Sequence, residues 1–146
     1  MVRVRRVPGV RLLVILLGLF FVLWMPFEGD LRLVAALGIW TALTVTALLA
    51  QRLLTGRWLR AWQFTLVSFG LGVILGFSAP LFILLLMALK TGLHGHGPEF
   101  TMDEILWVQR QLPLWFGAGG LAGLGAGLVY LGRLPVAASA TPDEEP

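Results

Sequence analysis

Two histidines, His94 and His96, lie close together in the sequence and are the residues best suited to bind a metal ion. Glu99 and Asp103 follow within a few positions, and imidazole and carboxylate groups are ligands for zinc or copper. The two histidines lie in a glycine-rich loop predicted at residues 90–100, and glycine with proline is also typical of a simple turn. We prefer the turn and keep His94 and His96 as candidate metal ligands, with no catalytic or cofactor-binding residue predicted.

A second polar group, Trp40 with Thr41 and Thr44, falls inside an apolar stretch. These side chains could line a small pocket for a lipid headgroup, a quinone or a substrate. However, threonine hydroxyls in membrane helices commonly bond to their own backbone, and a tryptophan in mid-span is usually a packing residue. Packing is therefore the preferred interpretation of this group.

Small residues recur every four positions in two later apolar stretches. The two sets are Ser68, Gly72 and Gly76, and Gly119, Gly123 and Gly127, the second flanked by Ala118, Ala122 and Ala126. This spacing places each set on one helix face, where the backbones of neighbouring helices can approach closely. The pattern predicts that these helices pack through the two faces, or that one face docks a partner helix. A flexible helix that gates a substrate path is the lower-ranked alternative.

The elements that carry these residues are four apolar runs, at residues 10–27, 33–50, 64–89 and 112–131. A bilayer core about 30 Å thick requires about 20 apolar residues per helix, and 58% of the chain is hydrophobic. We therefore expect an all-α integral membrane protein, with four transmembrane helices arranged as two antiparallel hairpins in one domain, residues 1–133. Residues 134–146, rich in proline, small residues and acids, are predicted to be a disordered cytoplasmic tail.

A short helix is expected before the fourth span. Thr101 and Glu104 have the spacing of a capping box, and Ile105 and Val108 continue on one apolar face. The pattern predicts a short interfacial helix that begins at Thr101 and leads to Pro113.

Basic residues indicate how the spans are oriented. Eight of the 11 Lys and Arg residues lie in the N-terminal segment, in the loop at residues 52–60 or after the fourth span. Cytoplasmic loops carry an excess of such residues, so both termini and the second loop are expected in the cytoplasm, as in a multi-pass protein of the cell (plasma) membrane. Because the arginines flank apolar runs and form no continuous patch, a nucleic-acid partner is not expected.

Several activities lack their usual residues. The chain has no cysteine, and no span carries an ionisable side chain in its interior, which weighs against thiol chemistry, proton relays and ion-coupled transport. Small multidrug resistance transporters have a similar size but use an intramembrane glutamate, and quinone-linked disulfide-forming enzymes use cysteine pairs. The chain has neither feature, so the sequence assigns it to no family.

The leading hypothesis is a non-enzymatic accessory or structural subunit that packs through its glycine-rich helix faces and needs no cofactor. Its expected partners are the lipid bilayer and other membrane-protein helices, or a second copy of itself. A small transporter or channel formed by oligomerisation is the alternative from a different class. A metal-binding external loop at His94 and His96 is the third possibility.

Overall fold

The computed structural model describes residues 1–4, 9–27, 30–94 and 99–133. Five helices and one two-stranded ladder make up this part of the chain. They are β1 (Val2–Arg3), α1 (Val10–Trp24), α2 (Leu31–Leu54), β2 (Trp58–Leu59), α3 (Ala61–His94), α4 (Met102–Arg110) and α5 (Leu112–Gly132).

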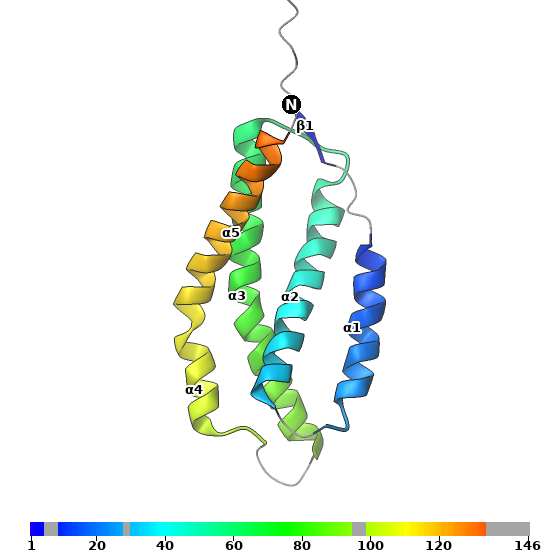
Figure 1. Cartoon of the computed structure of the whole chain (residues 1–146), viewed down its shortest axis with the longest axis vertical. Helices are drawn as coiled ribbons and strands as arrows, with labels where there is room; N and C mark the ends of the chain where they lie inside the picture. Colours follow the sequence, from blue (N-terminus) through cyan, green and yellow to red (C-terminus); the bar gives the residue numbers. More distant parts are fainter. Residues whose placement is uncertain (5–8, 28–29, 95–98, 134–146) are drawn as a thin grey trace, which may run out of the picture.

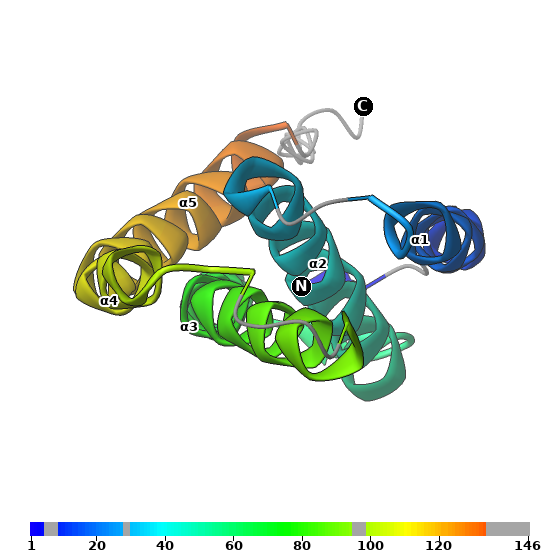
Figure 2. The same ribbon diagram turned by 90° about the horizontal axis from the view of Figure 1, so that it is seen from below.

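The helices lie along one common long axis (Figure 1). β1, β2, the end of α2, the start of α3 and the end of α5 lie together at the top of this view, which we call the N-terminal end. The end of α3 and the starts of α2 and α4 lie at the opposite end. Seen along the axis, α3 packs beside both α2 and α5, while α1 stands at the edge against α2 (Figure 2).

Three helices, α2, α3 and α5, are long and apolar enough to cross a membrane. Each is close to a predicted apolar run, although α2 and α3 extend beyond the predicted ends because polar residues at their termini continue the helix. The fourth predicted span, residues 10–27, contains α1, which has 15 residues. At 1.5 Å per residue, α1 is about 22 Å long, which is shorter than a bilayer core.

A two-stranded ladder holds the start of the chain at the N-terminal end. Val2 is paired with Leu59 and Arg3 with Trp58 in antiparallel register. Gly56 adopts a positive φ of 84°, which lets the chain turn after α2, and its N–H donates to the carbonyl of Val4 at 3.0 Å. No strand was predicted in this segment.

The capping box predicted at Thr101 is confirmed. The Glu104 N–H donates to the Thr101 hydroxyl at 3.3 Å, and the Thr101 N–H donates to the Glu104 carboxylate at 2.8 Å. These bonds satisfy two N–H groups that a helix start leaves without partners. α4 runs along the long axis below α5 instead of lying flat across the end of the bundle (Figures 1 and 2).

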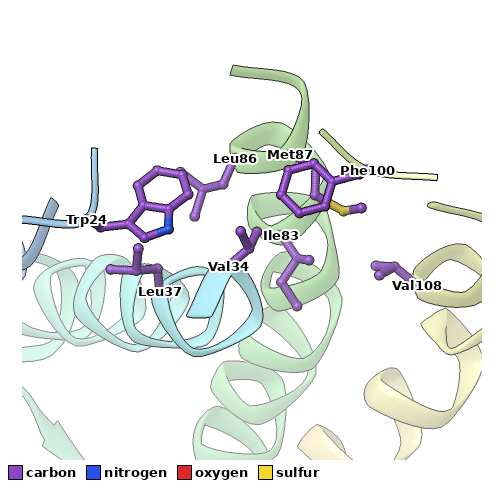
Figure 3. Close-up of a cluster of buried hydrophobic side chains, with 8 residues drawn as sticks. All are labelled: Trp24, Val34, Leu37, Ile83, Leu86, Met87, Phe100 and Val108. Carbon is purple, nitrogen blue, oxygen red and sulfur yellow. The ribbon is translucent and has the colours of Figure 1, made fainter. Parts of the chain in front are cut away.

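Buried side chains gather toward the opposite end of the bundle (Figure 3). We call this group the side-chain core: Trp24, Val34, Leu37, Ile83, Leu86, Met87, Phe100 and Val108. Its members come from α1, α2, α4, the second half of α3 and the residue before the Thr101 cap, so the side-chain core joins four helices at one level.

Candidate functional site

The first half of α3 packs against α5 through glycines, which we call the glycine seam: Gly72 and Gly76 of α3 with Gly119 and Gly123 of α5. A Cβ atom built on Gly72 would lie 2.8 Å from the Cα of Gly123, and one on Gly119 would lie 2.8 Å from the Cα of Gly76. Real Cβ atoms essentially never approach other atoms so closely. The two backbones are therefore in direct contact, as the four-residue spacing predicted.

The glycine seam continues toward the N-terminal end at Gly127. A Cβ on this residue would lie 3.0 Å from the Cβ of Ser68, which is tight but less severe than at the centre. The carbonyl oxygens of Trp115 and Gly119 lie nearest to the faces of Gly76 and Gly72. This geometry brings Cα–H groups to neighbouring carbonyls, an arrangement that recurs at close helix–helix contacts and adds weak attraction.

A third close approach, between α2 and α3, was missed by the sequence reasoning. A Cβ on Gly38 would lie 2.8 Å from the backbone nitrogen of Ile83. Gly38 is not part of a small-residue repeat. Ala42, four residues later, is small, but Val34, four residues earlier, is not. A single glycine in an apolar helix therefore gives little signal of where it will be packed.

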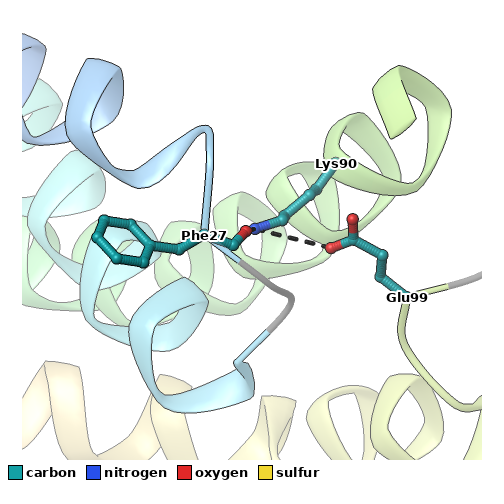
Figure 4. Close-up of polar contacts among 3 residues, drawn as sticks. All are labelled: Phe27, Lys90 and Glu99. Atoms are coloured by element: carbon teal, nitrogen blue, oxygen red, sulfur yellow. Dashed lines mark hydrogen bonds and ion pairs between the residues drawn. The ribbon is translucent and has the colours of Figure 1, made fainter.

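Lys90 lies in a helix and not in the loop predicted from the sequence. It was assigned to an external loop, but it lies in the last turns of α3 and its side chain is fully buried. Its ammonium donates to the backbone carbonyl of Phe27, lies 3.7 Å from the Glu99 carboxylate and sits 4.6 Å from the centre of the Trp24 ring (Figure 4). A buried cation needs such partners because desolvation is costly.

This lysine joins parts of the chain that are distant in sequence. Phe27 follows α1, Lys90 lies near the end of α3, and Glu99 precedes α4. Trp24 of α1 is 2% exposed, and its ring face supports the cation. We call Lys90 and its three contacts, Phe27, Glu99 and Trp24, the clamp, because together they hold three helices at the opposite end of the bundle.

The candidate metal ligands receive no support from geometry. His94 is the last residue of α3, and His96 lies outside the described residues. Within residues 1–4, 9–27, 30–94 and 99–133, no group of three His, Cys, Asp or Glu side chains is placed to hold a metal ion. The predicted disordered tail, residues 134–146, also lies outside the described residues.

The polar group in α2 bonds to its own backbone and packs against α1. The Thr41 hydroxyl donates to the Leu37 carbonyl at 2.7 Å, and the Thr44 hydroxyl donates to the Trp40 carbonyl at 2.8 Å. The Trp40 ring packs against Phe20 of α1, with ring centres 5.9 Å apart. The backbone-bonding and packing interpretation of these residues is therefore confirmed.

Comparison with known proteins adds no relative from which a function could be transferred. No family model, no curated protein and no solved structure matches the chain. The functional argument therefore depends on the contacts, the exposed surfaces and the charges of this chain itself.

Proposed function

We propose that the protein crosses the plasma membrane four times, as two antiparallel hairpins with both termini in the cytoplasm. The support is that β1, β2 and the end of α5 lie at the same end of the bundle (Figure 1), where the arginines of β1, of the last turn of α2 and beside β2 also lie. Although α1 is short, a helix below the hydrocarbon thickness is accommodated by local thinning of the bilayer and by snorkelling of flanking side chains such as Arg11.

Within that membrane, we propose a role as an accessory subunit without chemistry of its own. The observation that carries this proposal is the unpartnered outer face of α5. On this face Leu114, Leu121 and Leu128 are 54% to 70% exposed, and Gly117 and Gly125 have open space where a Cβ would stand. Small residues between large apolar ones let another helix approach closely, which is how membrane helices recognise one another.

The glycine seam is distinct from this outer face because it is already filled by contact with α3. A channel through a single copy would need a path between helices, and the glycine seam provides none because its backbones touch. A transport path through the glycine seam of a single copy is therefore closed. The accessory role requires only the outer face of α5.

The test uses the absence of cysteine, since Leu121→Cys introduces a unique thiol on the outer face of α5. In native membranes, cross-linking through this introduced thiol should trap one defined neighbour, and adding Gly125→Leu should abolish the product while the protein melts normally. Gly70→Leu, on an open face of α3, is the matched control and should leave the cross-link intact. If the purified protein is instead monomeric and moves solute into liposomes, the accessory role is wrong.

A further inference from the structure

A small cavity lies between α2 and α3 at the N-terminal end, beneath the ladder, and we call it the N-terminal cavity. Its volume is about 140 Å³. Most of its lining is apolar and comes from both helices and from the ladder: Ala50 and Leu54 of α2, Phe64 and Val67 of α3, Leu59 of β2, and Val4, which follows β1. Apolar cavities of about 150 Å³ stay dry in proteins. The part of the chain that covers the mouth therefore decides whether the cavity meets water.

Val4 and Leu59 form this cover. Successive side chains of a strand point to opposite faces, and Leu59 lines the cavity while Trp58, the preceding residue, is 61% exposed. Val4 continues the pairing beyond β1. Its N–H donates to the carbonyl of Arg57 at 3.0 Å, and its own carbonyl accepts from the N–H of Gly56 at 3.0 Å. The ladder thus turns one apolar face toward the cavity.

The ladder holds β1 weakly. It has two strands, so β1 is bonded along one edge in the part of the chain that the structure describes. Two-stranded ladders are marginally stable even when a tight turn joins the strands. Here α1 and α2 separate β1 from β2, which adds loop-closure entropy to the cost of pairing. The space beneath Val4 also deprives it of atoms that would attract it.

The helices below are held together by other contacts. α2 touches α3 where Gly38 meets Ile83, α3 touches α5 along the glycine seam, and the side-chain core lies at the opposite end. Gly9, just before α1, has a φ of 85° and open space where a Cβ would stand. Glycine changes its backbone angles at little steric cost. β1 can therefore leave β2 while the helices stay packed.

We infer that residues 2–4 form a lid, which opens the N-terminal cavity to water at that end of the bundle. When the lid is closed, Leu54 and Phe64 are covered. When it is open, a small water-soluble molecule reaches the cavity from the end of the bundle and not through the lipid. The inference holds for either orientation of the bundle in a membrane, and it does not depend on the accessory role.

The experiment measures how fast a charged, water-soluble thiol reagent labels a cysteine placed in the N-terminal cavity. Because the chain has no cysteine, Ala50→Cys supplies the only thiol. In detergent micelles, whose apolar interior excludes the reagent, labelling should be slow and proportional to the open fraction of the lid. Val4→Pro removes the N–H that donates to Arg57. It should raise the labelling rate about fivefold, because the net contribution of one hydrogen bond shifts an opening equilibrium by about that factor.

Two further variants distinguish a lid from a general loosening of the bundle. Ala42→Cys, on the same helix but 0% exposed and away from the ladder, should stay protected with and without Val4→Pro. Val4→Leu keeps the N–H and adds a methylene group above the cavity, so it should slow the labelling of Ala50→Cys.

Three results would overturn the lid. The first is an unchanged labelling rate of Ala50→Cys when Val4→Pro is added. The second is faster labelling at both cysteine positions, which would mean that the whole bundle had loosened. The third is labelling of Ala50→Cys alone as fast as that of free cysteine, because the cavity would then have no cover.

Discussion

The two halves of α3 pack in opposite ways. Its first half touches α5 backbone to backbone through the glycine seam, where no side chain intervenes. Its second half contributes Ile83, Leu86 and Met87 to the side-chain core, where large groups from four helices interlock. Pro80, buried between the two regions, lies inside a helix that continues without interruption to His94.

This difference predicts which kind of substitution destabilises each region. Lipid tails are as apolar as leucine, so helices in a membrane gain little from burial and depend on the number of close contacts. In the glycine seam these contacts form between backbones, because glycine has no side chain. In the side-chain core they form between large side chains that fit together. Added atoms should therefore damage the first region, and deleted atoms should damage the second.

The largest expected effect is that of Gly123→Leu in the glycine seam. Its side chain would enter space already filled by the backbone of Gly72, forcing the helices apart at a cost of more than about 3 kcal/mol. Thermal unfolding in detergent measures the loss. Leu128→Ile, on the exposed face of α5, is the control and should change stability by less than about 0.5 kcal/mol. A parent-like melt for Gly123→Leu would show that the glycines serve flexibility instead.

The next effect concerns the charge beside the side-chain core. Lys90→Met keeps the length of the side chain but leaves the Glu99 carboxylate and the Phe27 carbonyl without the cation, at a cost of about 2 to 3 kcal/mol. Adding Glu99→Gln should recover part of the loss, because no unpaired charge then remains. A double-mutant cycle on the free energy of unfolding measures this coupling, and strictly additive effects would refute the clamp.

Leu37→Ala deletes atoms where the side-chain core is closely filled, since Leu37 is 1% exposed. We expect a loss of about 2 kcal/mol, at the low end of the usual range because transfer from lipid contributes little. Leu43→Ala, on the same helix and 47% exposed, should have almost no effect in the same unfolding assay. Equal losses at both positions would mean that α2 is not packed through its Leu37 face.

The smallest expected effects come from adding a single methyl group, which should lower stability inside the glycine seam and raise it outside. Gly72→Ala should destabilise by about 1 kcal/mol, because the overlap with Gly123 exceeds the gain in helix propensity. Gly70→Ala, two residues earlier and in open space, should stabilise by up to about 1 kcal/mol. Opposite shifts in melting temperature would support direct backbone contact, and two stabilising shifts would contradict it.

Local patterns explain what the sequence could predict. The apolar runs indicated the long helices, the capping box indicated the start of α4, and the four-residue spacing indicated the glycine seam, since each depends on residues within a few turns of one another. The backbone bonds of Thr41 and Thr44 are equally local. These features could be derived without knowing which helices become neighbours.

The features that were missed depend on distant segments. The apolar run stops at Lys90 and therefore suggested a loop, yet the helix continues and its cation reaches a carbonyl 63 residues away. Gly38 packs on Ile83, although no repeat of small residues in the sequence indicates this contact. Thr46 resembles its neighbours Thr41 and Thr44 in sequence, but its hydroxyl has no hydrogen-bond partner among the residues that the structure describes.

The ladder between β1 and β2 has a consequence for the order of events during synthesis. Val2 pairs with Leu59, so the first strand has no partner until the ribosome has added a further 57 residues. At about 5 to 20 residues per second, this interval lasts roughly 3 to 11 seconds. By then α1 and α2 have both been made, so the N-terminus is tethered only after the first two helices have been synthesised.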